Sequence, residues 1–277
     1  MAIISFWGND EKETGQTLSV VAIGTEMAID HNKKILIIST GYKDKTMEDC
    51  FWEKRNLNIA GTEQPQGGIA NGFEGLVKII QSNRTSSNII RDYAKVVFRD
   101  RLDILLAPST NDPKIYNNLT TFYKDLLKYA NQEYEIVLVD VDKRMNGEDK
   151  SEILKASDAV MVTCKQSQDG FEMIRNLKEK STNYKKRNIM YLLGKYDFNS
   201  KYNTKNLTRI LKETREISAV PYNMSYYEST MEGKVADFFL NNRSLTDNAD
   251  VNARFIQECK RCCENIIAKI EELKMKM

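Results

Sequence analysis

The amino-acid sequence predicts an α/β protein built on a mainly parallel sheet of seven or eight strands, with helices on both faces. Two observations support this prediction. Short apolar runs alternate along the chain with longer segments that have the spacing of amphipathic helices. The apolar runs also lack the alternation of a half-exposed strand, and continuously apolar strands are typical of parallel sheets buried on both faces.

The expected strands and helices follow one another in a regular order. The apolar runs expected to form strands are residues 2–7, 35–39, 102–107, 136–140, 159–163, 189–193 and 217–220. The segments with helical spacing are residues 17–30, 73–81, 87–94, 114–130, 150–156, 170–180 and 204–214. Residues 58–72 are expected to form a long surface loop within one domain.

The end of the chain is predicted to be an amphipathic helix that follows a polar segment near residues 244–249. Apolar side chains recur there at spacings of three and four, at Phe255, Cys259, Cys262, Ile266, Ile270, Leu273 and Met277. The polar face mixes glutamates with lysines, which suits packing on the domain or self-association better than an anionic membrane. We therefore expect an α/β domain at residues 1–243 and a C-terminal helix within residues 244–277.

Composition excludes several classes of protein. The formal net charge is only +2, which argues against a strongly electrostatic nucleic-acid binder. No apolar run approaches the roughly 20 residues that a membrane span needs, and the apolar start is too short for a signal peptide. We expect a cytoplasmic protein, peripheral to a membrane-bound assembly if it meets a membrane at all.

Five cysteines in such a chain predict free thiols rather than a disulfide framework. The spacing of Cys259, Cys262 and Cys263 suggests a metal site, but zinc sites usually draw ligands from two chain segments. A second Cys/His cluster is absent from the sequence, and His31 is the single histidine. Helix packing is therefore the favoured role for these cysteines.

The loop after the first strand has the position of a phosphate-binding loop. A strand, a loop at residues 8–16 and a helix from Thr17 form the unit in which the motif G-x-x-x-x-G-K-[ST] is found. This chain has Asp10 in place of the first Gly, keeps Gly15 and Thr17, and has Gln16 in place of the Lys. Gln16 can donate a hydrogen bond but supplies no charge to a phosphate.

The charges of this loop disfavour phosphate. Backbone N–H groups at a helix N-terminus still favour an anion. The carboxylates of Asp10, Glu11 and Glu13 repel it, and only Lys12 opposes them. Two interpretations stay open: a weak nucleotide site, or a loop that no longer binds nucleotide.

The stretch YEIVLVDVDK, residues 134–143, is a buried strand that ends in aspartate. This is the form of a Walker B element, whose Asp supports Mg²⁺. Asp140 is the first candidate for that role and Asp142 is the second.

Taken in order, seven stretches resemble the ParA/MinD family of deviant Walker A ATPases, in the SIMIBI class of P-loop NTPases. These stretches are ETGQTLSVVAIGTEMA, KKILIIST, LDILLAPS, YEIVLVDVD, SDAVMVTCKQSQDGFEMIRNL, MYLLGKYDFNSKYN and ISAVPYNMSYYESTMEGK. The FWG start and the region from GLVKIIQSN to LDILLAPS are most similar to the TadZ/CpaE-like branch, in which some P-loops are degenerate. The resemblance covers most of residues 2–240.

The resemblance implies ATP or ADP with Mg²⁺ as the ligand, bound weakly or not at all. The positions it assigns to nucleotide are Lys12, Thr14, Gly15, Gln16, Thr17, Leu18, Asp140, Pro221 and Tyr222, with Thr17 and Asp140 also on the metal. The chain departs from the family where charge is needed. Glu11 stands at the signature Lys, Ser39 and Gly41 at two Asp positions, and Gly194 at the base-contacting Asn. Losing several such contacts predicts a pseudo-ATPase with negligible hydrolysis.

Three functions fit this sequence. The first is a ParA/MinD-like positioning or assembly factor for a Flp/Tad-type pilus or secretion system, acting as a homodimer and through protein partners. Residues 222–227 and the helix from Phe255 to Met277 are the expected dimer contacts. The second is an active ATPase whose missing charges come from Lys12 or a partner. The third is a partition protein that binds DNA without sequence preference, for which the basic clusters at residues 185–187 and 260–261 are short.

Overall fold

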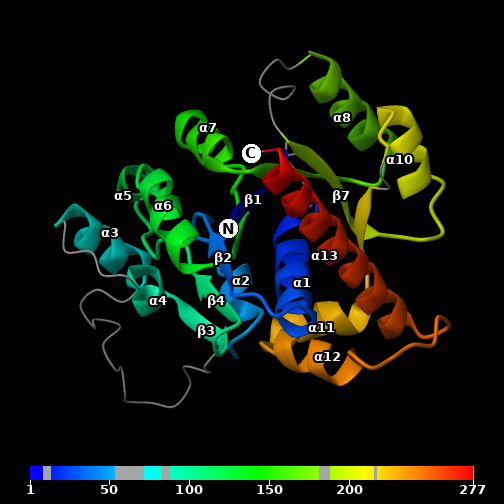
Figure 1. The fold of residues 1–277 in the computed structure, drawn as a ribbon, viewed down its shortest axis with the longest axis horizontal. Coiled ribbons are helices and arrows are strands. Elements are labelled where there is room, and N and C mark those ends of the chain that lie inside the picture. The colour runs from blue at the N-terminus through cyan, green and yellow to red at the C-terminus, as the bar shows by residue number, and fades with distance from the viewer. Residues whose placement is uncertain (9–13, 54–71, 83–87, 181–187, 215–216, 277) are drawn as a thin grey trace.

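The computed structural model describes residues 1–8, 14–53, 72–82, 88–180, 188–214 and 217–276. Among these residues eight strands form one sheet in the order β3-β4-β2-β5-β1-β6-β7-β8, with helices on both faces (Figure 1). Every neighbouring pair is parallel except β3 and β4, which are antiparallel. The predicted fold class, a mainly parallel sheet of seven or eight strands between helices, is confirmed.

Seven of the strands match the predicted apolar runs to within a few residues. Their bounds are β1 (Ala2–Trp7), β2 (Ile35–Ser39), β4 (Leu102–Leu105), β5 (Ile136–Asp140), β6 (Ala159–Cys164), β7 (Ile189–Tyr196) and β8 (Ser218–Pro221). The edge strand β3 (Lys95–Phe98) was not predicted. Its Val96 is 48% exposed and its Lys95 is exposed, so it lacks the continuous apolar run that predicted the other strands.

The helices that cover the sheet differ from prediction at a few points. Their bounds are α1 (Gln16–Asp30), α2 (Thr46–Asp49), α3 (Phe73–Gln81), α4 (Ile89–Tyr93), α5 (Pro113–Thr120), α6 (Tyr123–Glu133), α7 (Gly147–Ala156), α8 (Gln168–Lys180), α10 (Thr204–Leu211), α11 (Met224–Glu232), α12 (Val235–Asn242) and α13 (Val251–Met275). The single helix predicted at residues 114–130 is wrong, since α5 ends at Thr120 and α6 starts anew at Tyr123. The Thr120 and Thr121 hydroxyls donate to backbone carbonyls three residues earlier, which favours ending a helix there. Helices α11 and α12 were not predicted.

Alternate residues of the central strands enter two separate cores. Ile3 and Val137 belong to the core under α6, α7, α8 and α10, whereas Ile4 and Leu138 belong to the core under α1, α12 and α13. Burial on both faces explains why these strands are apolar at most positions. Parallel strands also bring their carboxyl ends to one edge, where the loops after β1, β5 and β7 meet.

The C-terminal helix α13 lies along α1 and β8 (Figure 1). Its buried face includes Cys262, whose Sγ donates to the Ala219 carbonyl, and Cys263, whose Sγ donates to the Ile23 carbonyl. All five cysteines are buried free thiols. Across the described ranges, no group of three His, Cys, Asp or Glu side chains is placed to hold a metal ion. The division of the chain at residue 243 stays a prediction.

In the part of the chain that the structure describes, no helix combines the length and the apolar character needed to cross a bilayer.

Candidate functional site

The candidate site lies where β1 ends and α1 begins. Gly15 is the residue before α1 and has a left-handed backbone with φ of 74°. Glycine adopts this conformation without steric cost, and it has no side chain with which to cap the helix. The first turn of α1 also carries no acidic side chain. The N–H groups of this turn and the helix dipole therefore favour an anion at Gly15.

Next to this turn, Gln16 and Thr17 are both hydrogen-bonded to Asp140 at the end of β5. The Gln16 amide donates to Asp140 Oδ1 at 2.7 Å and to the Val141 carbonyl at 3.1 Å. The Thr17 hydroxyl donates to Asp140 Oδ2 at 2.7 Å. We call Gln16, Thr17 and Asp140 the polar corner. Both carboxylate oxygens of Asp140 are thus engaged by neutral donors of α1.

The environment of Asp140 controls its charge. Asp140 is only 7% exposed, and this burial raises the pKa of its carboxyl group to about 6. Hydrogen bonds from Gln16 and Thr17 act in the opposite direction, while the charges of Asp44 and Asp142 raise the pKa further. The carboxylate is charged at neutral pH and becomes neutral as the pH falls below about 6.

Asp142, the second Walker B candidate, is committed to other partners. Arg144 donates to it from Nη2 at 2.7 Å and from Nε at 3.1 Å, and the Tyr42 backbone N–H donates at 2.8 Å. Burial alone would raise the Asp142 pKa, but the hydrogen bonds from Arg144 and Tyr42 outweigh burial and lower it. These contacts tie the ends of β2 and β5 together.

The two positions where the resemblance implies aspartate lie beside the polar corner. Ser39 is paired in register with Asp140, and the Gly41 N–H donates to Ser39 Oγ at 3.4 Å. Neither side chain supplies a charge. The nearest carboxylate on this segment belongs to Asp44, whose Cβ would lie 2.8 Å from a Cβ added at Gly41. Sequence reasoning missed Asp44 because it follows the expected position by three residues.

A bulge in β7 brings a second segment against the loop. The pairing of β7 with β8 shifts between Leu193 and Tyr196, which displaces Gly194 and Lys195. A Cβ at Gly194 would overlap the Thr14 carbonyl oxygen. A side chain is therefore excluded at the position where the resemblance implies a base-contacting Asn.

Lys195 has a left-handed backbone with φ of 51° and packs beside Gly15. A Cβ added at Gly15 would lie only 2.9 Å from the Cγ of Lys195. The close packing of Lys195 against this position therefore requires glycine at residue 15. Lysine rarely adopts this conformation, and such strain is common at functional sites. Nothing in the sequence indicates that Lys195 lies beside Gly15, because this position results from the bulge in β7.

A cavity of about 260 Å³ adjoins Gly15. It is lined by Gly15, Leu18, Ser19, Lys195, Val220, Pro221, Tyr222, Asn223, Tyr226 and Tyr227. Tyr222 is 53% exposed and Tyr227 is 41% exposed, whereas the buried Tyr226 donates its hydroxyl to the Leu18 carbonyl at 2.7 Å. Of the described lining residues, Lys195 alone carries a charge.

The structure thus places most predicted site residues in two adjoining parts. Gln16, Thr17 and Asp140 form the polar corner, whereas Gly15, Leu18, Pro221 and Tyr222 line the cavity. Thr14 is buried and contacts Gly194. Lys12, with Asp10, Glu11 and Glu13, lies outside the described residues. Whether these residues bind nucleotide stays a prediction.

Comparison with known proteins gives little at the level of sequence. No protein-family model matches the chain. A segment of 99 residues, or 35% of this chain, is 29% identical to part of the arginine–tRNA ligase of Methanobrevibacter smithii. The chain spans only 17% of the length of that ligase.

Solved structures give a clear match in fold. The cell division ATPase MinD of Pyrococcus furiosus has a TM-score of 0.65 at 12% identity, over 99% of this chain and 100% of that one. A ParA family ATPase of Chlorobium tepidum has a TM-score of 0.64 at 14% identity, over 92% and 95%. The septum site-determining protein MinD of Pyrococcus horikoshii, complexed with Mg-ADP, has a TM-score of 0.60 at 12% identity, over 97% and 98%. The chain has the fold of ParA/MinD family ATPases.

Proposed function

We propose that this protein is a ParA/MinD-like positioning or assembly factor whose nucleotide site is degenerate. Its fold is shared with ParA and MinD ATPases over nearly the whole chain. The observation that carries the proposal is the polar corner, in which Gln16 stands where a P-loop has lysine and donates to Asp140. Such a site keeps a place for phosphate without the charge that turnover requires.

The missing charge has a chemical consequence. Phosphoryl transfer depends almost entirely on positioning and on stabilising charge that develops on the phosphate. Loss of one such contact costs roughly two orders of magnitude or more in rate. Gln16, Ser39, Gly41 and Gly194 together remove several of the contacts that the resemblance implies. We therefore expect negligible ATP hydrolysis.

Weak binding of ATP or ADP with Mg²⁺ is compatible with the described residues. The Thr17 hydroxyl and the Asp140 carboxylate are oxygen donors of the kind that Mg²⁺ prefers. The N-terminus of α1 suits a phosphate, and the exposed ring of Tyr222 beside Lys195 suits a base. The Mg-ADP complex of the Pyrococcus horikoshii MinD supports this choice of ligand.

The finer parts of the proposal concern branch, partners and location. We place the protein in the TadZ/CpaE-like branch, as a factor for a Flp/Tad-type pilus or secretion system that works in the cytoplasm beside a membrane-bound assembly. We further propose a homodimer that forms across the face carrying the loop. Exposed apolar side chains of Tyr222, Met224, Tyr227 and Met231 support such an interface.

A second candidate function is an active ATPase whose missing charge comes from another residue. The observation that favours it is Lys195, whose side chain lies beside Gly15. Lys12 or a partner protein could add a further cation. This candidate predicts micromolar nucleotide binding that is lost in a Lys195→Ala variant.

Calorimetry with Mg-ATP and Mg-ADP, combined with light scattering, tests the proposal. We expect heats of weak binding only, and a dimer without nucleotide at tens of micromolar protein. A dimer that forms without nucleotide should bury on the order of 1,200 Å² or more. Micromolar or tighter ATP binding would favour the active ATPase, and a strict monomer with or without ATP would contradict the dimer.

A further inference from the structure

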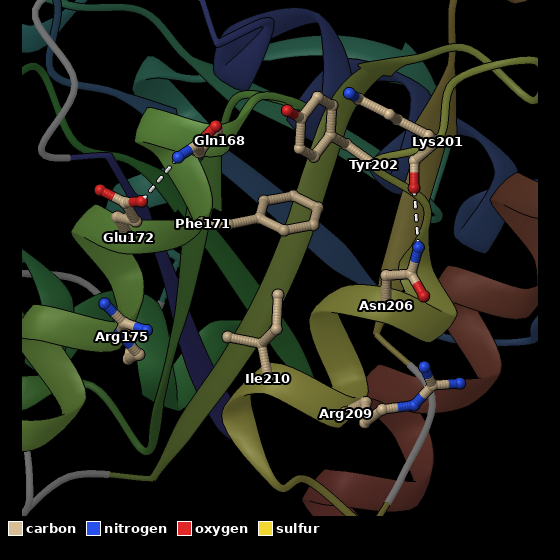
Figure 2. Close-up of a pocket in the computed structure, with 9 residues that line it drawn as sticks. All are labelled: Gln168, Phe171, Glu172, Arg175, Lys201, Tyr202, Asn206, Arg209 and Ile210. Atoms are coloured by element: carbon tan, nitrogen blue, oxygen red, sulfur yellow. Dashed lines mark hydrogen bonds between the residues drawn. The ribbon is translucent and has the colours of Figure 1, made fainter.

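A second and larger cavity of about 500 Å³ lies between α8 and α10, on the face of the sheet opposite α1 and α13 (Figure 2). It is lined by Gln168, Phe171, Glu172, Arg175, Lys201, Tyr202, Asn206, Arg209 and Ile210. We call it the α8–α10 cavity. Its volume falls in the range of about 300–1,000 Å³ that is typical of small-molecule sites.

The base of this cavity is aromatic and aliphatic. The Phe171 ring is almost fully buried and meets the Tyr202 ring edge-on, with 5.7 Å between centroids. Ile210 points toward Phe171 from α10 and is 43% exposed (Figure 2). Together these three side chains offer an apolar surface that could cover a flat hydrophobic group.

Hydrogen bonds hold the polar lining in place. The Gln168 amide donates to Glu172 at 3.0 Å, and the Asn206 amide donates to the Lys201 carbonyl at 2.7 Å (Figure 2). In addition, Gln166 exchanges two hydrogen bonds of 2.8 Å with the backbone of Asp197. The bonds between Gln166 and Asp197 join the loop before α8 to the segment that follows β7 and leads to α10.

The rim of the cavity has an excess of positive charge. Arg175, Lys201 and Arg209 are three cations against the single carboxylate of Glu172, a net charge of +2. Among residues the structure describes, neither arginine has an ion-pair partner. Lys201 lies over the Tyr202 ring, with 5.2 Å from Nζ to the ring centroid. Cations from both helices thus surround an apolar base.

We propose that the α8–α10 cavity binds a small amphipathic anion, in which a carboxylate or a phosphate is joined to an aromatic or branched apolar body. Phe171, Tyr202 and Ile210 cover the apolar body. One of the arginines at the rim, Arg175 on α8 or Arg209 on α10, receives the acidic group, since the planar fork of a guanidinium matches carboxylate and phosphate geometry. A small molecule is favoured over a protein segment because the volume of the cavity matches that of small-molecule sites.

The first test uses the full chain and two probes that share a naphthalene body, one with an anionic and one with a neutral polar group. The anion is 2-naphthoate and its neutral counterpart is 2-naphthalenemethanol, with inorganic phosphate as an acid group without an apolar body. Titrations followed by ¹H–¹⁵N NMR should shift backbone signals of α8 and α10 with 2-naphthoate. We expect at least tenfold weaker binding of the alcohol and of phosphate.

The second test removes the charge of the rim. The double variant Arg175→Gln, Arg209→Gln should bind 2-naphthoate about tenfold more weakly. Arg99→Gln is the matched control, since Arg99 is exposed in the turn between β3 and β4, and it should leave binding unchanged. Equal binding of acid and alcohol, absence of shifts in α8 and α10, or an unaffected double variant would overturn the proposal. Binding of a glutamate-rich peptide at these residues without binding of 2-naphthoate would overturn it in favour of a protein partner.

Discussion

The polar corner and the α8–α10 cavity lie on opposite faces of one sheet and treat charge in opposite ways. In the corner, the Asp140 carboxylate is held by neutral donors from Gln16 and Thr17. In the α8–α10 cavity, Arg175 and Arg209 lie at the rim, with no carboxylate bound to them among the described residues. The N-terminal turn of α1 has Gln16 where the P-loop motif has lysine, while the rim of the α8–α10 cavity has a net charge of +2. Fold and site therefore need separate arguments.

The largest expected effect comes from the bulge of β7, which adjoins the loop. Gly194→Asn would restore the side chain that the resemblance implies, but its Cβ would overlap the Thr14 carbonyl. We expect a loss of about 3 kcal/mol or more in the free energy of unfolding. Chemical denaturation measures it, with Gly147→Ala as the control because a Cβ there meets open space. A Gly194→Asn variant as stable as the native chain would show that the loop moves aside easily.

The next effect restores charge to the corner. Gln16→Lys should strengthen Mg-ATP binding ten- to hundredfold, because a charge-assisted hydrogen bond replaces a neutral one. Gln168→Lys makes the same change in the α8–α10 cavity and should leave ATP affinity unchanged. Calorimetry compares the two variants. Equal behaviour would mean that the loop has lost its phosphate-binding geometry along with its charge.

A change of pH should separate the two regions. The folded-state pKa of Asp140, about 6, lies above its ordinary value of 3.8, so the carboxylate loses its charge as the pH falls through 6. Mg-ATP binding should weaken about tenfold between pH 7 and pH 5, beyond the change seen without Mg²⁺. Binding of 2-naphthoate should not follow this titration, because arginines stay charged throughout. NMR titrations at both pH values provide the measurement, and an Asp140→Asn variant that keeps the full pH dependence would refute the assignment.

The smallest effect concerns the wall of the cavity that adjoins Gly15. Tyr226→Phe removes the hydrogen bond to the Leu18 carbonyl and should cost about 1 kcal/mol of unfolding free energy. Tyr222→Phe removes a hydroxyl from an exposed ring and should change stability by less than about 0.5 kcal/mol. Thermal unfolding of the two variants side by side checks this, and identical losses would contradict the role given to Tyr226.

The fold could be predicted because its signal is local. Most strands of the buried sheet are largely apolar, as in Ile35–Ser39, so a short window of sequence identifies them. Strand β3 gave no such signal, since Lys95 and Val96 are exposed at the sheet edge. The break between α5 and α6 depends on threonine hydroxyls that bond to the backbone, which periodicity does not detect.

The candidate site could be predicted only in part. Gly15 and Thr17 match the P-loop motif and Asp140 matches the Walker B motif. In the structure the Thr17 hydroxyl donates to the Asp140 carboxylate. Lys195 was missed because its place beside Gly15 results from a bulge and a left-handed backbone. The α8–α10 cavity was missed for a related reason. Arg175 and Arg209 lie far apart in sequence on two ordinary amphipathic helices, and only packing places them at the rim of one cavity.

Phosphate release from Mg-ATP by the purified protein tests the central claim most directly. The measurement compares the native chain with its Thr17→Ala variant, at equal protein concentration and with the same contaminant controls. We predict that the two rates are the same and indistinguishable from a blank without protein, because the polar corner lacks the charge that phosphoryl transfer needs. A clear turnover in the native chain that Thr17→Ala abolishes would contradict the account and establish an active ATPase.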